Sequence, residues 1–336
     1  MTISKNRFLA SVLVCLVMII EFSGCSTKSK SPEFDFGKTS YLNIVIDSLN
    51  LLKMMQLREL ALETGVMNDR VKEKFTCVVN FEGRQLPAKI RFKGDWTDHL
   101  AGEKWSFRIE LQNGSILGKK TFSIQHPATR GFGQEWLLHK FLSENGILTT
   151  TYSFIPVRLN SKDLGLYALE EHFEKQLLES QNRREGVILK FNETPFWTAR
   201  MFEKTNESNP YFPEFESCVI EPFGKKKTMK SKKLKSQLEL GNNLVEMYRS
   251  YHPGADLYLD IERFAKFFAI ITLGNSRHGT TWHNQRWYTN PITMRLEPIG
   301  FDCYGQTASI SESNQLLSAV MSMELENPVS PAQYFR

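Results

Sequence analysis

The residues best suited to chemistry fall into three groups: basic side chains on one strand face, an acid on a helix, and an amide followed by a carboxylate. They are Arg91 and Lys93, Glu135, and Asn284 with Asp302. Phosphoryl transfer uses these residue types, because a cation contacts the phosphates, an acid orients that cation, and carboxylate and amide oxygens bind magnesium. Phosphate and metal chemistry is therefore the first hypothesis for this chain.

Hydrophobic periodicity predicts the elements that position these residues. Strands are expected over 41–47, 104–111, 152–159, 164–170 and 186–191, around Asn290-Pro291, and in a hairpin over 76–93 that turns at 82–84. Helices are expected over 48–63, over 133–144, and from a cap at Asp260 to Gly274. The pattern predicts an α+β fold with a β-rich N-terminal half over 39–222 and a more helical C-terminal half over 223–336.

The predicted helix over 133–144 is amphipathic. Its apolar residues Trp136, Leu137, Phe141 and Leu142 are expected to form the buried stripe. Glu135 is expected to point from the same helix towards the basic strand face.

The N-terminus has the order of parts found in a secretory signal. Lys5 and Arg7 precede an apolar run that is too short to cross a bilayer, which favours a cleaved signal over a permanent anchor. Ser23 and Gly24 directly before Cys25 are typical of a bacterial lipobox. We expect a signal peptide over 1–24, lipidation of Cys25, a flexible tether over 25–38, and an exported, membrane-anchored lipoprotein of the cell envelope.

The cysteine content indicates how the folded part is stabilised, and the charge distribution indicates which partners it could bind. Cys77, Cys218 and Cys303 remain for the folded part, and three thiols cannot form a disulfide framework, so a hydrophobic core must supply the stability. The net charge is +5, and seven lysines fall between positions 225 and 235. This cluster is either a solvated surface or a contact for anionic lipid or an acidic protein. It lacks interleaved aromatic residues, which argues against a nucleic-acid partner.

Four sequence blocks resemble the CotH family. They are Arg91-Phe92-Lys93-Gly94-Asp95 with Lys104-Trp105-Ser106-Phe107; the run 122–127 with Arg130 and Glu135-Trp136; the run 159–173 with 184–186; and the run 282–288 with Asn290-Pro291 and Gly300-Phe301-Asp302. Blocks in this order, over about residues 75 to 305, are more specific than any single motif.

The resemblance implies an atypical kinase-like, two-lobed fold that binds ATP with Mg²⁺ or Mn²⁺, in a family known for secreted protein kinases. It implies that Lys104 contacts the nucleotide phosphates, with Arg91 or Lys93 nearby, and that Glu135 orients Lys104. Asn284 and Asp302 would bind the metal.

Two consecutive acids, Glu170 and Glu171, stand in the third block. On a strand they point to opposite faces, so only one can face the cleft. The family's spacing from Gly165 favours Glu171.

The family pattern is broken at the position of the catalytic aspartate, about five residues before Asn284, where this sequence has Gly279 beside His278. His278 could act as the base, bind metal together with His283, or do neither. Three hypotheses follow: a Ser/Thr kinase of envelope proteins, a nucleotide-binding pseudokinase that serves in envelope assembly, and a metal-dependent hydrolase that uses His278, His283 and Asp302.

Overall fold

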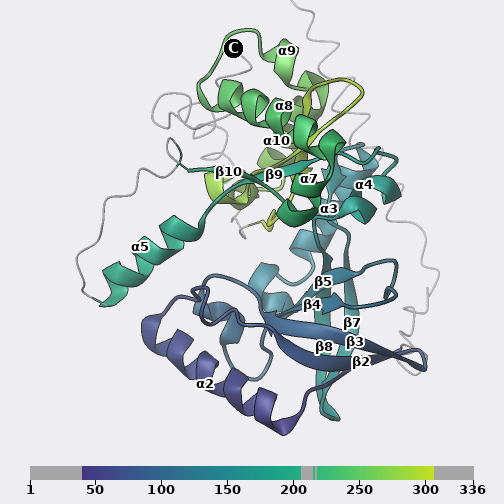
Figure 1. The fold of residues 1–336 in the computed structure, drawn as a ribbon, viewed down its shortest axis with the longest axis vertical. Helices are drawn as coiled ribbons and strands as arrows, with labels where there is room; N and C mark the ends of the chain where they lie inside the picture. The colour runs from purple at the N-terminus through teal and green to yellow at the C-terminus, as the bar shows by residue number, and fades with distance from the viewer. Residues whose placement is uncertain (1–39, 206–214, 216–217, 306–336) are drawn as a thin grey trace, which may run out of the picture. The chain divides into compact units, whose positions relative to one another are not determined.

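The computed structural model describes residues 40–205, 215 and 218–305 (Figure 1). The predicted signal peptide, the tether and Cys25 lie outside these residues. None of the helices in the described ranges combines the length and the apolar character that a membrane crossing requires.

Seven strands close into a barrel in the order β1-β2-β3-β4-β5-β8-β7 (Figure 1). Neighbours are antiparallel, except that β1 and β7 pair in parallel and complete the ring. The strands are β1 Leu42–Val45, β2 Phe75–Phe81, β3 Arg84–Phe92, β4 Phe107–Leu111, β5 Thr121–Gln125, β7 Tyr152–Leu159 and β8 Lys162–Glu171.

The predicted hairpin over 76–93 is confirmed as β2 and β3. Glu82 and Gly83 at its turn both have positive φ angles, of 51° and 73°, which suit the right-handed twist of a two-residue hairpin turn. Residues that alternate along β3 and β4 fill the barrel core, because successive side chains of a strand point to opposite faces. The buried ones are Ala88, Ile90, Phe92, Phe107, Ile109 and Leu111. Arg91 and Arg108 are therefore left on the opposite face.

A second sheet has the strand order β10-β9-β11-β12-β6. Its strands are β6 Leu148–Thr149, β9 Ile188–Phe191, β10 Ile220–Pro222, β11 Arg286–Thr289 and β12 Leu296–Gly300. β6, β9 and β10 precede position 223 and β11 and β12 follow it. The expected boundary between 222 and 223 therefore does not separate the two sheets.

The three predicted helices, over 48–63, over 133–144 and from Asp260 to Gly274, are present. They are α2 Ser48–Thr64, α3 Gln134–Glu144, α4 Lys175–Ser180, α5 Thr194–Thr205, α7 Lys225–Lys230, α8 Lys232–Arg249, α9 Ala255–Tyr258 and α10 Ile261–Leu273, with short 3-10 turns η2 Thr97–Leu100, η3 Pro127–Arg130, η4 Arg277–Thr280 and η5 Trp282–Asn284. Asp260 caps α10 by accepting a hydrogen bond from the Arg263 amide, as predicted. The helices α4, α5, α7, α8 and α9 were not predicted.

The predicted apolar stripe of α3 is wrong for three of its four residues. Trp136, Leu137 and Phe141 are exposed. The helix buries the face that carries Leu138 and Leu142 together with Glu135 and His139. Those two polar residues tolerate burial because they pair with each other, at 2.9 Å.

The mixed α+β class with a β-rich N-terminal half is confirmed. Its barrel core is contiguous, and a second apolar cluster lies between β9, β11, α8 and α10. The polar ends of β3, β4, β9 and β12 then converge on a single large cavity.

Candidate functional site

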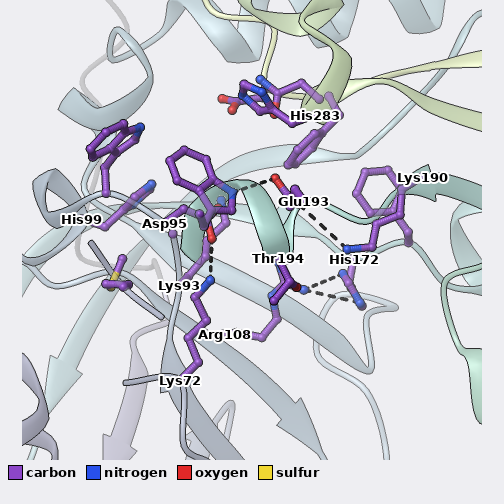
Figure 2. A pocket seen from close by; sticks show the side chains of 18 of the residues that line it. Lys72, Lys93, Asp95, His99, Arg108, His172, Lys190, Glu193, Thr194 and His283 are labelled. Carbon is purple, nitrogen blue, oxygen red and sulfur yellow. Dashed lines mark hydrogen bonds and ion pairs between the residues drawn. The ribbon is translucent and has the colours of Figure 1, made fainter. Parts of the chain in front are cut away.

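A cavity of about 860 Å³ is lined by residues from both sheets and from the turns η2, η3, η4 and η5. Nine of its lining residues are Lys or Arg and five are Asp or Glu. Figure 2 shows Lys93, Arg108 and Lys190 around this space, with Asp95 and Glu193 among them. A concave surface with surplus positive charge concentrates anions, and a polyphosphate is an anion of suitable size.

Lys93, which lines this cavity, forms a buried ion pair with Glu170. Lys93 follows β3, and its ammonium donates to Glu170 Oε2 at 2.7 Å and to Gln125 Oε1 at 2.6 Å. Burial lowers the pKa of Lys93, and the adjacent Glu170 carboxylate opposes that shift. The strands β5 and β8 thus hold one cation in a fixed position at the edge of the cavity.

Asp302 and Asn284 face the same cavity from the C-terminal part of the fold. Asp302 lies just beyond β12 with a left-handed φ of 54°, which turns its carboxylate out of the strand direction. Its Oδ1 lies 2.5 Å from Arg130 Nε and its Oδ2 lies 3.2 Å from His278 Nε2. Burial alone would raise the pKa of Asp302, but the charge of Arg130 and the hydrogen bond from His278 hold it well below its usual range.

The donor set suits a hard divalent cation. Asn284 Nδ2 donates a hydrogen bond to the His278 carbonyl at 3.0 Å, so the amide oxygen remains available as a metal ligand. Asp302 is ionised, so its carboxylate oxygens can also bind a metal. Magnesium sites of phosphate enzymes use one or two such oxygens and complete the shell with phosphate and water. In the described part of the chain no three His, Cys, Asp or Glu side chains gather into a ready-made metal site.

Helix α3 supports Asp302 through Arg130. Arg130 Nε also lies 3.4 Å from Glu135 Oε2, and Glu135 Oε1 lies 2.9 Å from His139 Nε2. The His139 ring contacts the Thr150 carbonyl through Nδ1 at 2.8 Å. Burial lowers the pKa of His139, but the hydrogen bond to Glu135, the charges of Glu135 and Glu170 and the contact with the Thr150 carbonyl together raise it overall.

A family model described as CotH kinase protein matches residues 90–331, which is more than half of the chain. The chain belongs to the CotH family. The resemblance found in the sequence is thereby confirmed. A search of curated proteins gives no match.

Lys104 is not among the residues that line the cavity of this CotH chain. It precedes β4, and its ammonium donates to the Leu166 carbonyl at 3.3 Å and lies over the Tyr167 ring. The prediction that Lys104 meets Asn284 and Asp302 is therefore wrong in its geometry. The reason is that the strand begins at Phe107, so Lys104 lies in the preceding turn and not on the strand face.

The two predicted acids also differ in position. Glu170 pairs with Lys93, whereas Glu171 accepts hydrogen bonds from the Thr151 amide and hydroxyl, at 3.2 and 2.8 Å. Glu135 orients Arg130 instead of Lys104. Alternation along β8 predicted that only one glutamate could face the site, but the register that chooses between them is set by pairing with β5.

Gly279 occupies a position where the CotH chain has no room for a side chain. A Cβ atom there would lie 2.3 Å from Cys303 Sγ and 3.1 Å from the Phe301 carbonyl oxygen. The adjacent His278 lines the cavity beside Asp302.

Arg130 and Gln125 were not predicted to belong to the site, and Glu171 was favoured over Glu170. Arg130 and Glu170 stand inside the family blocks, so their position in those blocks was an available signal. Gln125 also stands in a family block, the run 122–127, but a glutamine at the end of a strand resembles any surface residue until its contact with Lys93 is known.

Proposed function

We propose that this chain is a CotH-like protein kinase that binds ATP together with Mg²⁺ or Mn²⁺ and transfers a phosphoryl group to a Ser or Thr hydroxyl of a protein. One observation carries the proposal: Lys93, which is held by an ion pair with Glu170, lines one positively charged cavity together with Asn284 and Asp302. Kinase-like phosphoryl transfer depends on that combination of cation, acid and metal-binding oxygens.

Each residue has a distinct role in this proposal. The bound divalent cation would neutralise charge on the phosphates, and Asn284 and Asp302 would hold it. Lys93 would contact the phosphates, with Glu170 and Gln125 fixing its position. In this proposal the fold is a two-lobed, kinase-like one, with the barrel as one lobe and the second sheet with its helices as the other.

His278 is the candidate for the proton acceptor. Asp302 is ionised and close to Nε2, so it favours the tautomer that carries its proton on Nε2. The Nδ1 atom of that tautomer has a lone pair, which can accept the proton of a hydroxyl group as it attacks.

The alternative is a nucleotide-binding pseudokinase that serves as an assembly or interaction module of the envelope. The absence of space for a side chain at Gly279 favours it, because the family's aspartate cannot be restored at that position. Both the kinase and the pseudokinase would bind nucleotide, but only the kinase would transfer the phosphoryl group.

The location proposed from the sequence is the bacterial envelope. Export through the signal of residues 1–24 and lipidation of Cys25 would tether the chain to a membrane, beside protein substrates outside the cytoplasm. Metabolic labelling with a fatty acid tests this directly: label in the wild type that is lost in Cys25→Ser supports the tether, and equal labelling of both chains refutes it.

The kinase proposal is tested with the full chain, labelled ATP, manganese and a mixture of envelope proteins. Nucleotide binding and label transfer are measured separately, in Asp302→Asn, in Lys93→Met and in a control, Asp256→Asn on the exposed helix α9. The kinase is supported if the wild type binds nucleotide in a metal-dependent way and transfers the label, and if both binding and transfer fail in Asp302→Asn and Lys93→Met. Binding without transfer supports the pseudokinase, and binding unaffected by either variant refutes both.

The proposal also distinguishes two lysines. Lys104→Met should leave nucleotide affinity unchanged, because Lys104 lies outside the cavity, whereas Lys93→Met should lower it at least tenfold, about 1.4 kcal/mol. The reverse ranking would restore the prediction from the sequence.

A further inference from the structure

Arg91 and Arg108 are directly opposite each other on the antiparallel strands β3 and β4. Residues paired in this way point to the same face and lie close together. Both arginines line the large cavity, and both also line a second hollow of about 480 Å³. The pair therefore stands where the two spaces meet.

Neither arginine has an acidic partner. Arg108 Nε donates to Ser123 Oγ at 2.8 Å and its Nη1 lies 2.7 Å from His172 Nδ1, while Arg91 Nη1 donates to the Phe92 carbonyl at 2.8 Å. No carboxylate within residues 40–205, 215 or 218–305 forms an ion pair with either guanidinium. Figure 2 shows the contact between Arg108 and His172.

The surroundings strengthen the positive field. Burial and the neighbouring charge of Arg108 lower the pKa of His172 well below its usual value, so its ring is neutral and accepts from Arg108. Burial, and next the charge of Arg91, lower the pKa of Arg108 to about 10. Like charges placed directly opposite each other on adjacent strands destabilise a sheet. Nearby carboxylates such as Asp95 offset part of this repulsion without forming an ion pair, and a bound anion would relieve more of it.

We propose that Arg91 and Arg108 form a binding site for a phosphomonoester dianion. Two planar guanidinium groups offer parallel N–H donors that match the oxygens of a phosphoryl group. Their two positive charges balance the double negative charge of a phosphomonoester, whereas a single carboxylate would balance only one of these two positive charges.

The hollow also distinguishes a phosphoryl group on a molecule from a membrane surface. The two arginines are half-buried, whereas Lys74, Lys120, Lys175 and Lys227, which line the same hollow, are exposed. A flat layer of lipid headgroups would contact the exposed lysines before the half-buried arginines. Two sources of the dianion remain: the terminal phosphate of a nucleotide in the large cavity, and a phosphorylated side chain of a protein segment in the second hollow.

This inference is independent of the proposed kinase activity, because it requires neither metal nor transfer. The full chain is heated in a buffer free of phosphate and metal, and then with saturating inorganic phosphate, and its Tm is recorded. The wild type should gain about 5 °C with phosphate. Arg108→Gln should gain none, and Lys89→Gln, which removes an exposed charge two residues before Arg91 on β3, should gain as much as the wild type.

The phosphate-free measurement separates a ligand site from a structural role. If the arginine pair is held for an anion, Arg108→Gln should melt at the same temperature as the wild type or higher, because the repulsion is removed. A variant that melts lower and still gains the full increment with phosphate would show a structural arginine and overturn the proposal. A wild type whose Tm does not rise with phosphate would also overturn the proposal.

A competition experiment identifies the source. Inorganic phosphate that is displaced by ADP assigns the site to the nucleotide. Phosphate that binds together with ADP, and is displaced by a phosphoserine peptide, assigns it to a phosphorylated segment. Displacement by anionic vesicles but by neither of these two would replace the proposal with a membrane contact.

Discussion

Arg130 Nε lies 2.5 Å from Asp302 Oδ1, so the candidate metal ligand is neutralised by an arginine of the same chain. Glu135 shares this arginine at 3.4 Å. A divalent cation at Asp302 would therefore compete with Arg130, which could remain paired with the buried Glu135.

Replacing Arg130 by glutamine should reveal this competition. Arg130→Gln removes the arginine that Asp302 and Glu135 share and leaves these buried carboxylates only their contacts with His278 and His139, so the free energy of unfolding should fall by about 3 kcal/mol. Millimolar Mn²⁺ should restore part of that loss and should stabilise the wild type less. Urea unfolding with and without MnCl₂ measures both effects. Arg158→Gln, at an exposed arginine, is the control, and an equal Mn²⁺ effect in all three proteins would contradict the competition.

Lys93 and Glu170 should behave as a coupled pair. Lys93→Met leaves Glu170 as an unpaired buried charge, so it should lower the free energy of unfolding by about 3–5 kcal/mol. The double variant Lys93→Met/Glu170→Gln should recover most of the stability but none of the nucleotide affinity. Urea unfolding and nucleotide titration test the two parts, and recovery of affinity would show that Lys93 does not contact the phosphates.

Restoring an aspartate at Gly279 should not restore a catalytic base. Gly279→Asp and Gly279→Ala should each lower the free energy of unfolding by about 1–3 kcal/mol, because any Cβ atom meets Cys303 Sγ and the Phe301 carbonyl. Adding Cys303→Ala should reduce the effect of Gly279→Ala. Strictly additive effects of the two substitutions in urea unfolding would show that the sulfur is not the obstacle.

His139 should make stability depend on pH. Both of its ring nitrogens lie against acceptors, Glu135 and the Thr150 carbonyl, and its pKa is raised above its usual 6.5. A raised histidine pKa contributes stability that is full below the unfolded value and is lost as the pH rises through the folded value. His139→Gln should therefore destabilise the protein more at about pH 6 than at about pH 9. Unfolding curves at both values that show the same loss would refute a charged His139.

Local patterns predicted the local structure well. The hairpin at Glu82-Gly83, the capped helix that begins after Asp260, and the alternation of buried residues along β3 follow from preferences that act over a few residues. The prediction for α3 failed because its buried face carries a glutamate and a histidine that satisfy each other, and no periodicity in hydrophobicity can show that pairing.

The sequence by itself determined the CotH family, the mixed α+β class and the residue types of the site, because motif order and periodicity are properties of the chain alone. Tertiary structure decided which lysine faces the cavity and which of two adjacent glutamates pairs with it. It also decided that Arg130 forms an ion pair with Asp302 and that Arg91 and Arg108 lie side by side. These choices depend on where strands begin and on the register between strands distant in sequence, where a shift of one residue exchanges the two faces of a strand.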